Sequence, residues 1–199
     1  MTNRADFLFE LGTEELPPKA LLRLSEALTE ELLTGLREAG LSFGPHQSYA
    51  APRRMAVLIR DVAASTPEQA VERKGPALAS AFDAQGKPSR ALEGFARSCG
   101  VAVGALEKIE TDKGTWLVYR HTQPGKTAAE IIPAAIARAL DKLPTPKRMR
   151  WGSHEVEFIR PVHWAVALHG NTVIDTEILG VKAGKETFGH RFHHPAAIT

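Results

Sequence analysis

The apolar and polar residues of this chain follow three patterns in its first 65 residues. FLFEL, residues 7–11, is a short apolar run of the kind that forms a buried strand. An amphipathic helix to about Ala39, capped by Gly40, is predicted next, because leucines recur at every third or fourth position from Leu21 to Leu36. QSYAAP and MAVLIRDV then predict two strands.

Residues 66–146 contain more glycine and proline and predict shorter elements. ALEGFARSCG favours a short helix that ends at Gly100, and TDKG predicts the turn of a hairpin whose second strand is TWLVYRH. Thr127 and Glu130 form a capping box, which marks the start of another helix. Pro133 lies inside that helix and is expected to kink it or to delay its start.

The last third of the chain returns to a strand pattern. VHWAVALH and TVIDTEIL, joined by Gly170 and Asn171, predict a tight hairpin, and a glycine-rich loop with a further strand follows. The whole pattern predicts an α+β fold with mixed or antiparallel sheets and packed amphipathic helices. We expect a sheet-containing domain from residues 1–65 and 147–199 and a smaller α+β middle domain from residues 66–146. The pattern leaves open whether the chain forms two consecutive domains or one domain interrupted by an insert.

Composition narrows the class of protein. The single cysteine, Cys99, excludes an internal disulfide framework and multi-cysteine zinc motifs, which fits a reducing compartment. No signal peptide and no run of about 20 apolar residues is present, so we expect a cytoplasmic protein that does not enter a membrane. The net charge is only +2. Basic residues nevertheless gather in APRR and KRMRW, which permits a nucleic-acid partner without requiring one.

The segment TFGHRFHHP, residues 187–195, holds three of the eight histidines, His190, His193 and His194. It contains no Asp, Glu or Cys, and the chain has no HExxH spacing, so we predict no metal site. Acid–base catalysis would need a partner and a pocket that the sequence does not identify, and we assign no catalytic residue. Phosphate-loop, dinucleotide-binding and nucleophile-elbow motifs are also missing from the sequence.

A pair of carboxylates and two basic stretches each allow a functional and a purely structural interpretation. The adjacent carboxylates Glu14 and Glu15 precede the first helix, and a favourable interaction with its N-terminus explains them without catalysis. In KRMRWG and FIRPVHW, arginines stand beside Trp151 and Trp164, which suits phosphate contacts and base stacking. Buried tryptophans with surface arginines would give the same pattern, so the residues alone do not decide.

Several longer segments in this order carry a family resemblance: FLFELGTEELPPK, APRRMAVLI, KGPALASAFDAQGKPSRALEGFARSCGV, MRWG, FIRPVHW and TFGHRFHHP. From Phe7 to Pro195 the chain resembles the N-terminal part of the β subunit of bacterial heterotetrameric glycyl-tRNA synthetase. The resemblance implies an α2β2 ligase that joins glycine to tRNA(Gly). It also implies that the α subunit carries the active site with ATP and Mg, that this region binds no cofactor, and that the β subunit continues beyond this region.

The resemblance makes the basic and histidine-rich stretches candidates for contacts with tRNA(Gly), the α subunit or a second β subunit. These candidates are Arg53, Arg54, Lys147, Arg148, Arg150, Trp151, Arg160, His163, His190, Arg191, His193 and His194. Two alternatives stay open: a purely structural scaffold that docks the α subunit, and a hydrolase or editing-type domain that uses the histidines.

Overall fold

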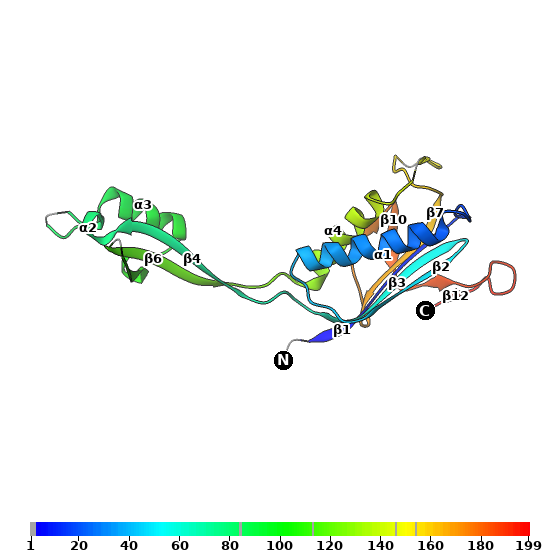
Figure 1. The fold of residues 1–199 in the computed structure, drawn as a ribbon, viewed down its shortest axis with the longest axis horizontal. Coiled ribbons are helices and arrows are strands. Elements are labelled where there is room, and N and C mark those ends of the chain that lie inside the picture. The colour runs from blue at the N-terminus through cyan, green and yellow to red at the C-terminus, as the bar shows by residue number, and fades with distance from the viewer. Residues whose placement is uncertain (1–2, 84, 113, 146, 154) are drawn as a thin grey trace. The chain divides into compact units, whose positions relative to one another are not determined.

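A computed structural model describes residues 3–83, 85–112, 114–145, 147–153 and 155–199 (Figure 1). The chain divides into two compact units, which are described separately below. Unit 1 comprises Met1–Thr66 and Lys126–Thr199, and unit 2 comprises Pro67–Gly125. Both combine strands with helices, so the predicted α+β class is confirmed.

Unit 1 is built on a mixed seven-stranded sheet with the order β2-β3-β1-β7-β10-β9, in which β8 pairs with β7. The pairing of β10 with β7 is parallel, and the other pairs are antiparallel. The predicted strand TVIDTEIL forms two short strands instead, β8 and β9, and β9 pairs with β10. The strands are β1 (Arg4–Thr13), β2 (His46–Ala51), β3 (Arg54–Ala63), β7 (Val162–His169), β8 (Thr172–Val173), β9 (Glu177–Ile178) and β10 (Val181–Gly184).

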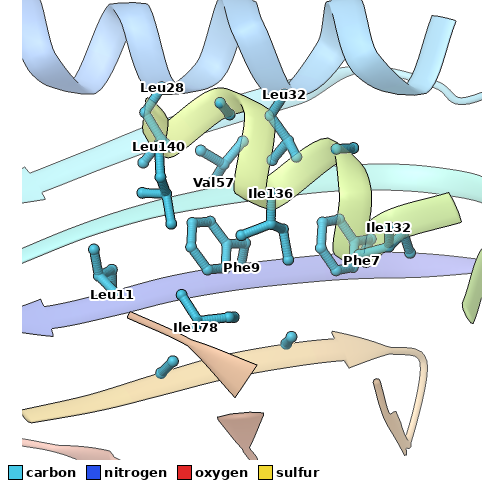
Figure 2. Packing of buried hydrophobic residues seen from close by; sticks show 14 of the residues in the cluster. Phe7, Phe9, Leu11, Leu28, Leu32, Val57, Ile132, Ile136, Leu140 and Ile178 are labelled. Atoms are coloured by element: carbon cyan, nitrogen blue, oxygen red, sulfur yellow. The ribbon is translucent and has the colours of Figure 1, made fainter. Parts of the chain in front are cut away.

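Helices α1 (Leu21–Glu38) and α4 (Ala128–Asp141) cover one face of this sheet (Figure 1). Alternate residues of β1 point into this layer, and Figure 2 shows Phe7, Phe9 and Leu11 beneath the two helices. Pro17 and Pro18 form a turn that precedes α1. Gly40 has the positive φ of +77° expected of a capping glycine. Both bonds of the predicted capping box at the start of α4 are present.

The other residues of β1 point to the opposite face of the sheet, where none of the helices in the described residues packs. Arg54 of β3, Gly12 of β1 and Trp164 of β7 form a row across three strands on this face. The chain returns to the same face in a small hairpin of β11 (Thr187–Phe188) and β12 (Ala197–Ile198), because Thr187 and Phe188 bond to side chains of β1 and β3. The predicted further strand in the glycine-rich segment is thus only two residues long.

Unit 2 is a three-stranded antiparallel sheet with the order β4-β6-β5, and its own core contains Ala81, Leu92 and Leu117. Its elements are β4 (Gln69–Ala77), α2 (Leu78–Ala81), α3 (Arg90–Cys99), a 3-10 turn (Val103–Ala105), β5 (Glu107–Thr111) and β6 (Gly114–Gln123). Its boundaries lie at residues 67 and 125, whereas the sequence pattern placed the second boundary at 146. The difference is α4, whose apolar side packs against α1 and the large sheet in unit 1.

A candidate nucleic-acid interface

Five of the predicted contact residues line one cavity of about 830 Å³ on the helix-free face of unit 1. Arg53 and Arg54 come from the turn between β2 and β3 and the start of β3, and His163 comes from β7. His190 and Arg191 come from the hairpin loop that joins β11 to β12. The lining is completed by three aromatic rings and small or polar residues: Trp164, Phe188, Phe192, Glu15, Ala51, Pro52, Gly189 and Pro195.

The buried carboxylate of Glu10 holds the wall of this cavity together. Its Oε1 accepts hydrogen bonds from Trp164 Nε1 at 2.7 Å and from the Thr187 hydroxyl. Its Oε2 lies 3.5 Å from Arg54 Nη1, and Arg54 also donates to the Phe188 carbonyl. A buried carboxylate requires such partners because its desolvation is costly. Glu10 therefore connects β1, β3, β7 and β11, and it uses the charge of Arg54 to do so.

Glu14 forms a second, more exposed junction. His163 Nε2 lies 2.8 Å from Glu14 Oε1, and Arg53 Nη2 lies 3.3 Å from the same oxygen. The hydrogen bond with His163 lowers the pKa of Glu14 below its ordinary value, and the charges of Arg53 and Arg191 act in the same direction. The interpretation of Glu14 as a partner of the helix N-terminus was wrong, because α1 begins only at Leu21 and has no acidic residue in its first turn.

Trp164 occupies its position because Gly12 leaves room for it. The indole lies across Gly12, where an added Cβ would overlap three carbons of the ring. Phe188 meets the Trp164 ring edge to face, with centroids 5.1 Å apart, and the Arg54 guanidinium lies 5.5 Å from the indole centroid. The two rings form a ridge at the cavity, and this ridge is fixed by packing and by the bond to Glu10.

The loop of residues 189–196 is short and tightly turned. His190 Nδ1 accepts from the backbone N–H groups of Phe192 and His193 at 3.3 and 3.4 Å, and the rings of His190 and His193 lie 4.6 Å apart. Arg191 places its guanidinium 4.9 Å from the Phe192 ring, and Phe192 is 74% exposed. His193 and His194 belong to this loop but do not line the cavity. No group of three or more potential metal ligands occurs in the part of the chain that the structure describes.

The remaining predicted contact residues lie apart from this cavity lining. Arg160 donates to the carbonyls of Glu15 and Ile159, both at 3.0 Å. Arg148 pairs with Asp141 at 3.2 Å and lines a different hollow of about 170 Å³ beside α4. Arg150 pairs with Glu157 at 3.1 Å, Trp151 packs against the core of unit 1, and Lys147 is exposed. The basic stretch around Arg148 and the histidine-rich loop therefore contribute to different surfaces.

Comparison with known proteins decides the family. The model of the family described as glycyl-tRNA synthetase beta subunit matches residues 7–199. The chain belongs to the glycyl-tRNA synthetase β subunit family. Relatives named glycine–tRNA ligase beta subunit are 55% identical over 196 residues in Hahella chejuensis and 54% identical over 193 residues in Marinobacter nauticus. These alignments cover 98% and 97% of this chain but 28% of each relative, so the chain spans about 28% of the length of these relatives.

Sequence reasoning missed two residues that shape the cavity, Glu10 and Gly12. It named Glu14 but missed the role of this residue. The alternation in FLFEL carried a usable signal, since a glutamate inside an apolar strand needs a buried partner. Its partners lie 44 to 177 residues away along the chain, so their identity required the fold.

Among the described residues, no helix is long and apolar enough to cross a membrane.

Proposed function

We propose that this chain is the N-terminal region of the β subunit of a glycine–tRNA ligase and that its cavity contributes to binding tRNA(Gly). One observation carries the RNA role: arginines and histidines from three distant segments converge on one cavity that also presents aromatic rings. Guanidinium groups bind phosphates through charge-assisted hydrogen bonds, and aromatic rings stack on bases. Family membership supports the ligase assignment.

In this proposal the chain positions RNA and does not make bonds. The α subunit activates glycine with ATP and Mg in the cytoplasm, while the β chain holds tRNA in an α2β2 assembly. Positioning raises the rate of glycylation, because the translational and rotational entropy of the tRNA is lost on binding and not in the chemical step. Loss of a phosphate contact should therefore weaken tRNA binding and slow glycylation without changing which group reacts.

The experiment compares Arg191→Ala with Arg23→Ala. Both arginines are exposed residues of unit 1, and Arg23 lies on α1, on the other side of the sheet. Binding of tRNA(Gly) is measured over a salt series, and glycylation is measured with purified α subunit and full-length β subunit. We expect Arg191→Ala to weaken binding roughly threefold to tenfold and to reduce the salt slope by about 1.

The proposed role in RNA binding is refuted if Arg191→Ala leaves affinity, salt slope and glycylation unchanged. A loss of the same size in Arg23→Ala would also refute it, because binding would then follow overall charge and not the cavity. Glycylation by α subunit alone, at the rate of the mixture, would remove any contribution of the β chain.

Docking of the α subunit is a second candidate role, and strand β2 favours it. All six residues of β2 are exposed, and β2 is an edge of the sheet, where backbone groups are available for pairing. Tyr49, 45% exposed, lies at the centre of this strand. We expect Tyr49→Glu to abolish co-elution of the chain with α subunit; unchanged co-elution would exclude β2 as the docking edge.

A further inference from the structure

A second hollow adjoins the cavity on the other side of the aromatic ridge. It has a volume of about 410 Å³ and shares His163, Trp164 and Phe188 with the cavity. Lys182 and Lys185 line it from β10 and the residue that follows. The ridge of Trp164 and Phe188 thus lines both hollows, each of which carries basic side chains, and Glu186 adds a carboxylate to the second hollow.

Most of the cationic charge at these hollows is already neutralised by carboxylates of the chain. Arg53 pairs with Glu14, Arg54 pairs with Glu10, and Lys182 pairs with Asp175 at 3.2 Å. Within the described part of the chain, Arg191 and Lys185 form no ion pair, although the charge of Arg191 also acts on Glu14. Glu15 and Glu186 add carboxylates to the linings of the cavity and of the second hollow. Tight binding of duplex RNA requires many phosphate contacts, and these two cations supply few of them.

Aromatic surface, by contrast, is abundant at the cavity. Phe192 exposes 74% of its area at the rim, and the Arg191 guanidinium lies over its ring. Trp164 and Phe188 also line the cavity, as a fixed ridge. Stacking on such rings contributes strongly per base, but only unpaired bases present a free face.

We propose that the cavity and the adjoining hollow bind unpaired nucleotides, one on each side of the Trp164–Phe188 ridge. Phe192 stacks on the base in the cavity, Arg191 and His190 bind its phosphate, and Lys185 binds the phosphate of the nucleotide in the second hollow. The ligand is single-stranded RNA, and a free nucleotide shares the same chemistry. The inference rests on the proposed RNA-binding function, and it deepens that function by naming the structural class of RNA.

The test measures binding of the 199-residue chain to three probes at matched salt. These are a short fluorescent single-stranded RNA, the same sequence annealed as a blunt duplex, and AMP. Phe192→Ala is compared with Leu22→Ala, whose side chain is 70% exposed on α1, so neither substitution removes core packing. We expect the single strand to bind about tenfold more tightly than the duplex, and Phe192→Ala to weaken the single strand alone by about tenfold.

Several outcomes would overturn the inference separately from the proposed function. Equal affinity for single strand and duplex, or an equal effect of Phe192→Ala on both, would keep an RNA role and refute the preference for unpaired nucleotides. AMP binding as tight as the oligonucleotide would make the cavity a free-nucleotide site. Loss of α-subunit binding by Phe192→Ala, with RNA affinity intact, would make the loop a protein contact. No binding of any RNA would refute the proposed function itself.

Discussion

Replacement of Gly12 by alanine tests the packing that places Trp164. The added methyl group would overlap ring carbons Cδ2, Cε2 and Cζ2 of the indole, so the ring must move away from β1. Movement of the ring strains the packing, at about 1–3 kcal/mol. It also breaks the bond from Trp164 Nε1 to the buried carboxylate of Glu10, at about 1.5–3 kcal/mol for a bond to a charged group. Partial relaxation makes about 3 kcal/mol a reasonable total.

The assay is thermal and urea unfolding followed by circular dichroism and tryptophan fluorescence. In a chain of this size about 3 kcal/mol corresponds to a fall in Tm of roughly 6–12 °C. Gly184→Ala is the matched control in the same sheet, because the nearest atom to its added Cβ lies 4.0 Å away. A Tm change of about 1 °C or less for Gly12→Ala, equal to that of the control, would refute the steric argument.

Three further predictions concern a helix start, a pH dependence and the basic stretch. Thr127→Ala removes the capping box of α4 and should lower stability in urea unfolding by about 1 kcal/mol, whereas Thr122→Ala, exposed on β6, should have a much smaller effect. The pKa of Glu14 is lowered in the folded chain, so its contribution to stability is present above the ordinary value of 4.5 and is lost as pH falls through the lower folded value. The stability difference between the wild type and Glu14→Gln should therefore be present at pH 7 and shrink at strongly acidic pH; a constant difference would contradict the assignment. Arg148 and Arg150 pair with Asp141 and Glu157 away from the cavity, so Arg148→Ala with Arg150→Ala should change tRNA affinity and its salt dependence much less than Arg191→Ala; an equal loss would place both arginines on the RNA surface.

The elements of the fold were predictable wherever local chemistry sets them. The leucine spacing of α1, the capping box of α4 and the turn glycines act over a few residues, and each produced the expected element. The assignment of α4 to unit 1 was not predictable, because its apolar face would suit a core in either unit. The contacts of α4 with α1, about a hundred residues earlier in the chain, and with the large sheet distinguish them.

The candidate site was predictable in residue type but not in assembly. The sequence drew attention to Arg53, Arg54, His163, His190 and Arg191, and the structure brings these five to one cavity. The sequence pattern predicted Arg148 and Arg150 as contact residues in the same way, but both lie outside the cavity and pair with nearby carboxylates. The sequence shows that a side chain is basic. Whether that side chain can bind a phosphate depends on the carboxylates that the fold brings near it.

The two ends of the segment that leaves and re-enters unit 1 are neighbours at an isolated antiparallel β-bridge. Ser65 and Thr127 form a bridge, Thr66 N–H donates to the Lys126 carbonyl at 2.9 Å, and Ala128 N–H donates to the Ala64 carbonyl at 2.8 Å. A tight two-residue turn can join two antiparallel segments paired in this way. Residues 67–125 could therefore be excised and replaced by Asn-Gly, yielding a minimal unit 1 with an uninterrupted path for its backbone. The same geometry would let a chain of very different length be spliced in at that point at little cost to the large sheet.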